Sequence, residues 1–146
     1  MLIAAYPSGV HEPAPLFPFW RPTNDGLTHY SDLRALVGDA GSLDTAYAAT
    51  YGGGVYKSTN AGRVWSSANQ GLSSSNVLAL LANGTRPGSI FAGTEDGLFR
   101  SDDRAATWTR DVPELTGATV HTLRATPTVE RMFAGTNKGG FVATCR

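Results

Sequence analysis

Short apolar runs alternate with turn residues along the chain, most clearly between positions 77 and 110. The runs have the length and composition of β-strands rather than helices. Four strands are expected here, at Val77–Ala82, Ser89–Thr94, Gly97–Ser101 and Thr107–Arg110. The residues between them, Asn83-Gly84, Arg86-Pro87-Gly88 and Glu95-Asp96-Gly97, include Gly and Asn, which allow positive φ, and Pro, which excludes helix. The pattern predicts a meander of antiparallel strands.

The same pattern recurs along the chain, with a tryptophan at equivalent places. Trp20, Trp65 and Trp108 are 45 and 43 residues apart, and residues 2–20 align without gaps on residues 47–65. The repeat divides the chain into units of about 1–20, 21–65, 66–108 and 109–146. A period of about 40 to 50 residues with four short strands is typical of a propeller blade. We therefore expect a single all-β domain, a β-propeller of four-stranded antiparallel blades.

The repeat register also predicts incomplete ends. It assigns three strands to the first unit, four to each of the next two and three to the last, which makes about four blades. The first blade lacks an innermost strand and the last lacks an outermost one, so the two ends do not complement each other into a standard blade. Because an open propeller exposes strand edges and an apolar face, three outcomes are open: a small four-bladed ring, pairing with another copy, or inclusion in a larger assembly. Assembly with a protein partner or a second copy is the favoured expectation.

Composition narrows the classes of function. Twelve Lys and Arg balance twelve Asp and Glu in 146 residues, so nothing favours nucleic acid or an acidic membrane surface. The single Cys145 cannot form a disulfide within the chain. The apolar N-terminal run stops at Pro7, too short for a signal peptide or a membrane span. A chain made with this N-terminus is expected in the cytoplasm, and a chain whose leader was removed is expected outside it.

The residues before the second and third tryptophans resemble the Asp-box, Ser-x-Asp-x-Gly-x-Thr-Trp, of sialidase-like repeats, also called bacterial neuraminidase repeats. Both copies are degenerate. In such a turn, Asp or Asn accepts backbone N–H bonds, Gly adopts positive φ and Trp packs between blades. We therefore expect structural roles for the residues that match the box: Ser58, Asn60, Gly62, Trp65, Ser101, Asp103, Thr107 and Trp108.

A longer pattern, Phe-Ala-Gly-Thr-x-x-Gly-Leu-Phe-Arg-Ser at residues 91–101, resembles three groups of propellers. These are xyloglucanase-type glycoside hydrolases, sortilin-type receptors and the photosystem II assembly factor family. The resemblance covers nearly the whole chain. The groups include both enzymes and protein-binding scaffolds, so a shared fold does not decide between these functions.

The sequence contains no recognisable catalytic pattern. No acid stands in a recognisable catalytic context, and the adjacent Glu95 and Asp96 on a turn are expected to be solvated. The arginine triad and Tyr-Glu pair that a sialidase requires are not recognisable. Gly52-Gly53-Gly54 lacks the spacing of a phosphate loop, and the three histidines lie far apart without a cysteine cluster. We expect no cofactor, no metal and no catalytic residue.

Propellers usually bind at one face, through the turns between the second and third strands and the loops between blades. Exposed aromatic, imidazole, carboxylate and amide groups in these loops are the candidate ligand contacts: Tyr6, His29, Tyr30, Tyr51, Glu95 and Asn137. The alternative for each is that it only covers blade packing. The leading functional hypothesis is a non-catalytic interaction or assembly module. The alternative is a carbohydrate-binding or glycoside-hydrolase-like propeller.

Overall fold

The computed structural model describes residues 3–5, 8–16, 19–128 and 131–144 of the chain. They form four antiparallel sheets that follow one another in chain order. The first contains β1 (Ile3–Ala5), β2 (Gly9–Pro13) and β3 (Trp20–Pro22). The second contains β4 (Leu33–Asp39), β5 (Ser42–Thr50), β6 (Gly54–Ser58) and β7 (Ser66–Ser67).

The third and fourth sheets repeat the arrangement. The third contains β8 (Val77–Ala82), β9 (Ile90–Thr94), β10 (Gly97–Ser101) and β11 (Thr109–Arg110). The fourth contains β12 (Val120–Ala125), β13 (Arg131–Thr136) and β14 (Gly139–Thr144). Short 3-10 turns, η1 (Tyr30–Asp32) and η2 (Pro113–Leu115), lie in two of the connections between sheets. The expected all-β propeller blades, with three, four, four and three strands, are confirmed.

The expected strand at residues 107–110 is shorter in the structure, where β11 begins at Thr109. The reason is that the two preceding residues bond elsewhere. The N–H of Thr107 donates to Asp103 Oδ1 at 2.9 Å, and the N–H of Trp108 donates to the carbonyl of Gln70 at 2.8 Å, outside its own sheet. Similarly, β9 begins at Ile90, one residue later than expected.

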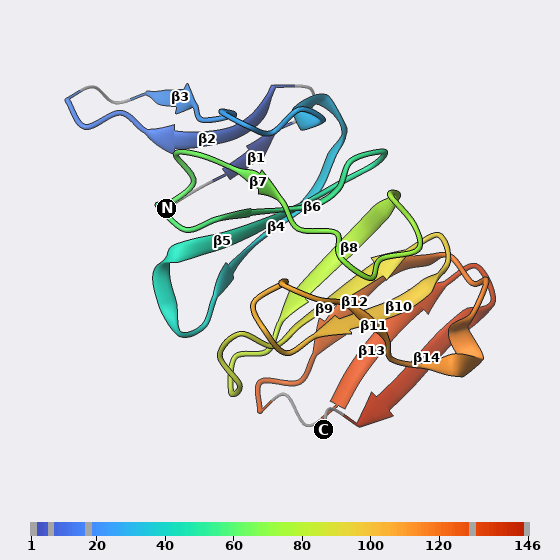
Figure 1. The fold of residues 1–146 in the computed structure, drawn as a ribbon. Helices are drawn as coiled ribbons and strands as arrows, with labels where there is room; N and C mark the ends of the chain where they lie inside the picture. The colour runs from blue at the N-terminus through green and yellow to red at the C-terminus, as the bar shows by residue number, and fades with distance from the viewer. Residues whose placement is uncertain (1–2, 6–7, 17–18, 129–130, 145–146) are drawn as a thin grey trace.

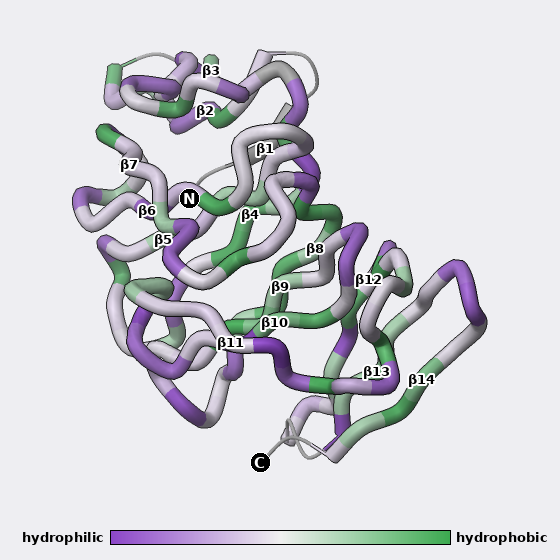
Figure 2. The backbone as a smooth tube through the Cα atoms, turned by 45° about the vertical axis from the view of Figure 1, so that its right-hand side comes forward, coloured by the Kyte–Doolittle hydropathy of each residue, from purple (hydrophilic) through white to green (hydrophobic). Residues whose placement is uncertain are grey.

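Each pair of neighbouring sheets encloses a buried apolar cluster. One cluster joins the first two sheets around Val10 and Trp65, and the next joins the second and third around Tyr47 and Trp108. The third joins the last two sheets around Phe91 and Leu123. Figure 2 shows the hydrophobic stretches on central strands such as β8 and β10, with hydrophilic turns around them. Burial between sheets, which favours folding by about 25 cal/mol per Å² of apolar surface, therefore holds the row together.

The four sheets form an open row. Figure 1 shows the first sheet and the last at opposite ends of it. Within the described ranges, one face of each end sheet has no further sheet packed on it, whereas the two middle sheets are covered on both faces. The small closed ring that the sequence left open is thus not formed by this chain alone.

The turns that lead to the fourth strands are stabilised by their own polar residues, and are called here the first box (residues 58–65) and the second box (residues 101–108) after the sequence resemblance. Ser58 Oγ accepts the N–H of Gly62 and donates to Asn60 Oδ1, both at 2.9 Å, while Asn60 Oδ1 also accepts the N–H of Val64. Gly62 has φ +84°, so it occupies the left-handed region that glycine enters without strain.

The second box repeats these bonds with a carboxylate. Ser101 Oγ donates to Asp103 Oδ1 at 2.7 Å and accepts the N–H of Ala105 at 2.9 Å. Asp103 also accepts the N–H and the hydroxyl of Thr107, and these bonds lower its pKa to about 2. Ala105 adopts φ +62° where the first box has glycine, so this turn carries backbone strain that Gly62 avoids.

Each box ends in a tryptophan that bonds to the preceding unit. Trp65 Nε1 donates to the carbonyl of Thr23 at 3.0 Å, and Trp108 Nε1 donates to that of Ala68 at 2.8 Å. Thr23 and Ala68 each lie three residues after the previous tryptophan. Both indoles are almost fully buried, whereas Trp20 in the first sheet is 39% exposed. The tryptophans therefore link neighbouring units by both apolar packing and a directed hydrogen bond.

Candidate functional site

The turns between the second and third strands of the last three sheets lie at equivalent positions. The turn in each sheet begins with Tyr51, Glu95 or Asn137. The backbone N–H of each donates to a carbonyl in the loop before its own sheet. Tyr51 bonds to Asp32 at 2.9 Å, Glu95 to Asn76 at 3.2 Å and Asn137 to Thr119 at 3.1 Å. One such bond per sheet thus links each turn to the neighbouring loop. The turns and loops together form one edge of the row, which we call the loop edge.

Side chains on this edge connect the second and third sheets. Tyr51 Oη donates to Glu95 Oε1 at 2.8 Å, and Asn76 Nδ2 donates to Glu95 Oε2 at 2.7 Å. The bond from Asn76, and then that from Tyr51, lowers the pKa of Glu95. The bond to Glu95 raises the pKa of Tyr51. Both bonds favour the ionised form of Glu95.

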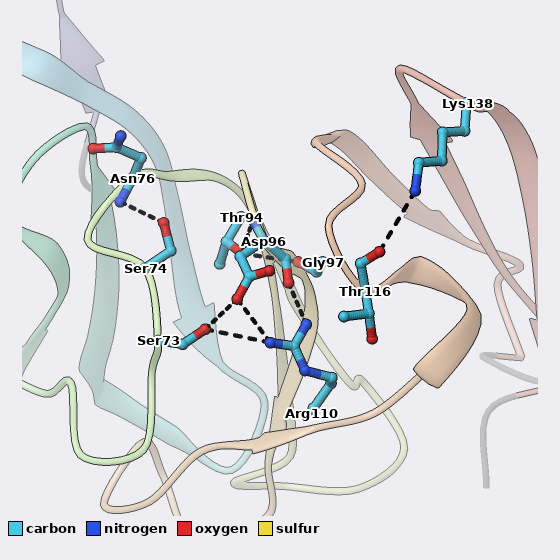
Figure 3. A network of polar contacts seen from close by, with 9 residues as sticks. All are labelled: Ser73, Ser74, Asn76, Thr94, Asp96, Gly97, Arg110, Thr116 and Lys138. Carbon is cyan, nitrogen blue, oxygen red and sulfur yellow. Dashed lines mark hydrogen bonds and ion pairs between the residues drawn. The ribbon is translucent and has the colours of Figure 1, made fainter.

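Asp96 is held on the other side of the same turn. Ser73 Oγ donates to Asp96 Oδ2 at 2.6 Å, and Arg110 Nη2 donates to the same oxygen at 2.7 Å. These two bonds, Ser73 first, lower the pKa of Asp96. The guanidinium of Arg110 also lies over the ring of Phe99, 4.9 Å from its centroid. Figure 3 shows this network, with Lys138 on the neighbouring sheet.

As expected for acids on a turn, Glu95 is exposed and Asp96 is partly exposed to solvent. The structure adds that side-chain hydrogen bonds hold both of them. Both carboxylates are bonded by side chains from the loop at residues 73–76, and Arg110 reaches Asp96 from β11. The repeat register predicts the loop at residues 69–76 on this face, but sequence reasoning did not single out Ser73 or Asn76, and it missed Arg110. The repeat register could have indicated these contacts, because it places the loop after each tryptophan beside the turn of the next unit.

The other expected ligand contacts are more dispersed. His29 Nδ1 lies 3.1 Å from the hydroxyl of Tyr56. A Cβ on Gly53 would lie 2.6 Å from His29 Nδ1, so the imidazole packs against the turn that carries Tyr51. Tyr30 is exposed in η1. Asn137 Oδ1 accepts the N–H of Thr119 at 3.0 Å, in the fourth sheet.

Tyr6, the remaining candidate, lies outside the described residues. The structure thus brings Tyr51 and Glu95 into direct contact, places His29 beside the same turn and leaves Asn137 one sheet further along. The Arg34 guanidinium covers the ring of Tyr51, 5.4 Å from its centroid. That face of the Tyr51 ring is occupied by a cation.

Among the residues described, no group of three or more His, Cys, Asp or Glu lies close enough to hold a metal ion. Within the same ranges no helix is long and apolar enough to cross a membrane. Burial raises the pKa of Asp111. That carboxyl lies away from the edge just described, beside a pocket that Phe91, Arg100 and Met132 help to line. The edge itself offers hydrogen-bond donors and acceptors arranged over several turns, which suits recognition of a polar ligand surface.

Comparisons with known proteins agree on the fold. No protein-family model and no curated protein matches the chain. Among solved structures, an ancestral GH74 enzyme matches with 27% identity and a TM-score of 0.65, covering 72% of this chain and 13% of its own. The GH74 xyloglucanase from Xanthomonas campestris matches with 18% identity and a TM-score of 0.69, covering 94% of this chain and 26% of its own.

A third neighbour was solved with a bound peptide. YCF48, solved bound to D1 peptide, matches with 18% identity and a TM-score of 0.67, covering 97% of this chain and 46% of its own. This chain therefore spans less than half the length of each of these three neighbours. The likenesses support a β-propeller arrangement, and they include both glycoside hydrolases and a peptide binder.

Proposed function

We propose that this chain is a non-catalytic β-propeller interaction module that forms part of a larger protein complex. The observation that carries the proposal is the exposure of one aromatic position. Tyr47 and Phe91, on the second strands of the two middle sheets, are 0% and 1% exposed, whereas the equivalent Phe133 on β13 is 45% exposed. A large aromatic side chain left open on a flat sheet face is typical of an interaction surface.

The equivalent aromatic residues of the two middle sheets show what kind of structure covers this face. Tyr47 and Phe91 are covered by the first strands of the following sheets, where Val77 of β8 and Val120 of β12 lie in the same clusters. A partner that covers Phe133 would supply the equivalent of these strands.

The loop edge supports a binding role without catalysis. Glu95 and Asp96 are both fixed by hydrogen bonds that lower their pKa, and a general acid needs a raised pKa near the working pH. Asparagine, tyrosine and carboxylate groups on adjacent turns instead provide directional contacts to a protein surface. One neighbour of this fold, YCF48, was solved bound to D1 peptide.

Carbohydrate binding remains the second candidate because the ancestral GH74 enzyme shares 27% identity over 72% of this chain. The exposed Tyr30, with His29 beside it, supplies an aromatic and an imidazole on the loop edge. A glycan array and a polysaccharide turnover assay on the folded chain test this function. We expect no binding and no turnover. Turnover that is lost when a pair of carboxylates is replaced would contradict the non-catalytic proposal.

Site-specific photo-crosslinking tests the main proposal directly. The photoreactive aromatic residue benzoylphenylalanine replaces Phe133 in the full chain, expressed in the cells that normally make it. The matched control places the same residue at Leu43, which is fully exposed in the hairpin between β4 and β5. We expect one discrete protein adduct from position 133, mapped by mass spectrometry, and none from position 43. Absence of a protein adduct at 133, or the same adducts from both positions, would overturn the proposal.

A further inference from the structure

A polar groove of about 620 Å³ lies between the second and third sheets, beside the fourth strand of the second sheet. One wall consists of Lys57 on β6 and residues 66–71, which include β7. The other wall consists of Ala105 and Ala106 in the second box. We call this space the β7 groove. Both of its walls belong to the two four-stranded sheets and the segment that connects them.

The repeat forms an equivalent groove between the first and second sheets, which we call the β3 groove. Its volume is about 250 Å³. Its lining residues are Glu12, Arg21, Pro22, Thr23, Asp25 and Arg63. Strand register relates the two grooves, because Glu12 pairs with Arg21 as Lys57 pairs with Ser66. The N–H of Trp65 donates to the carbonyl of Asp25, and that of Trp108 donates to the carbonyl of Gln70.

The charges that line the β3 groove balance one another. Arg21 Nη2 lies 2.5 Å from Glu12 Oε1, so an ion pair joins the neighbouring strands β2 and β3. Asp25 and Arg63 add one charge of each sign. The lining side chains of the β3 groove therefore carry no net charge.

The β7 groove is wider and carries a single charge. Ser66 and Ala106 stand where the β3 groove has its two arginines, and Gln70 stands where it has an aspartate. The shorter side chains of Ser66 and Ala106 account for the larger volume. Lys57 is the one charged residue of the lining, and none of the ion pairs among the described residues includes it. The β7 groove thus presents a cation without a counter-charge.

The polar groups near Lys57 are hydrogen-bond donors. Lys57 pairs with both Tyr47 and Ser66, so these three side chains share the sheet face that is turned toward the third sheet. Ser66 Oγ makes a long bond of 3.4 Å to the carbonyl of Lys57. Within the described ranges the side-chain amide of Gln70 makes no hydrogen bond. An ammonium group beside a hydroxyl and an amide N–H suits a carboxylate ligand.

The lining also indicates what kind of molecule carries the carboxylate. Pockets for small molecules are lined mainly by apolar and aromatic side chains, and none of the residues that line the β7 groove is aromatic. The groove therefore offers no ring on which a sugar could stack. Polar side chains and paired charges are instead typical of the rim of a protein interface. A protein segment is the carrier that these features favour.

We infer that the β7 groove binds an acidic side chain of a partner protein, with its carboxylate against Lys57 and the hydroxyl of Ser66. The contact forms between two proteins the kind of ion pair that Glu12 and Arg21 form within this chain. Such charge complementarity determines the orientation of a partner and its rate of association. The inference rests on the proposed function and specifies one chemical feature of the partner.

NMR titration of the full chain with two matched peptides tests the inference. The probes are N-acetyl-Gly-Glu-Gly-amide and the same peptide with Gln in place of Glu, both at low salt. We expect the Glu peptide to shift the backbone amide signals of Lys57, Ser66 and Ala106. The Gln peptide should bind about three- to fivefold more weakly, as expected for loss of one partly exposed ion pair. Added salt should reduce the difference between the peptides.

Variants of the chain provide matched controls. Lys57→Glu should remove the preference for the Glu peptide, whereas Lys138→Glu, an equal change of charge in the fourth sheet, should keep it. The double variant Lys57→Glu with Ser66→Arg recreates the ion pair of the β3 groove at the same strand positions. It should fold, because the first sheet accommodates that pair, and it should not bind the Glu peptide. The spectrum of each variant without peptide shows whether it is folded.

Three results would overturn the inference. They are equal binding of the Glu and Gln peptides, an unchanged preference in Lys57→Glu, and tighter binding of an oligosaccharide of galacturonic acid than of the Glu peptide. The photo-crosslink at position 133 is independent of these results, because Phe133 lies on β13 in the fourth sheet. Failure of the peptide test with a discrete adduct at 133 would reject the acidic contact alone. Failure of both would reject the proposed function as well.

Discussion

Phe91 and Phe133 occupy the same position in consecutive sheets, and only Phe91 is covered. Each is paired with a residue of the following strand, Arg100 for Phe91 and Val142 for Phe133. Phe91 is buried against Leu123 and other residues of the fourth sheet, while among the described residues no further sheet covers Phe133. One side-chain type in one backbone setting thus contributes to the core in one unit and to the surface in the next.

Truncating these two rings should have very different effects on stability. Phe91→Ala leaves a cavity between two sheets and should lower the free energy of unfolding by about 3–5 kcal/mol. Phe133→Ala, in the isolated chain, should change it by less than about 1 kcal/mol. Urea unfolding followed by circular dichroism measures both. Equal losses in the two variants would mean that Phe133 is covered in solution by the chain itself or by another copy.

Replacing a tryptophan should likewise cost more stability in the interior of the row than at its end. Trp108→Phe removes the bond from Nε1 to the carbonyl of Ala68 and part of a buried ring, so it should cost about 1–3 kcal/mol. Trp20→Phe affects a side chain that is 39% exposed at the open end and should cost less than about 1 kcal/mol. Thermal unfolding distinguishes the two variants. A larger loss for Trp20→Phe would contradict the assignment of the first sheet as an uncovered end.

Asp103 should make the folded chain less stable as the pH becomes acidic. Its pKa in the folded chain is about 2, below the value of about 3.9 in an unfolded chain. A lowered folded pKa adds stability that is complete above the unfolded value and is lost as pH falls from about 4 to about 2. Because the carboxylate is exposed to solvent, the contribution should be below about 1 kcal/mol.

Asp103→Asn provides the matched comparison, because Asn60 makes the equivalent bond to Val64 in the preceding box without titrating. The variant should keep the stability at neutral pH and lose the Asp103 contribution to the acid-dependent loss. Denaturation midpoints of the two proteins at neutral pH and near pH 3 measure the difference. Parallel pH profiles would show that the Asp103 bonds to Thr107 do not stabilise the turn.

The link between Tyr51 and Glu95 can be tested through the pKa of Glu95. Both Asn76→Ala and Tyr51→Phe remove a hydrogen bond to this carboxylate, so both should raise its pKa toward the ordinary range. The rise should be larger for Asn76→Ala, because its bond has the larger effect on the pKa. Titration of the Glu95 side chain by NMR measures the change. An unaltered pKa in Tyr51→Phe would mean that the two turns are not joined in solution.

The repeat made most of the fold predictable. Strand lengths, turn positions and the number of strands per sheet depend on local alternation and on Gly, Asn and Pro in tight turns. The bounds of β8 and β10 agree with those expected. The start of β11 was missed because Trp108 bonds to the preceding unit, and such a contact between units leaves no local signature.

The loop edge was only partly predictable. Register placed Tyr51, Glu95 and Asn137 in equivalent turns, but the bond between Tyr51 and Glu95 joins residues 44 positions apart. It depends on how closely two sheets stack and on side-chain rotamers, and neither property follows from periodicity.

The mass of the native assembly tests the central claim, that a protein partner covers the last sheet. The measurement is native mass spectrometry of the chain purified gently from the cells that make it, beside the variant Phe133→Glu. The account predicts a complex heavier than the 15.4 kDa chain, and loss of the partner from the variant. A 15.4 kDa monomer would contradict it.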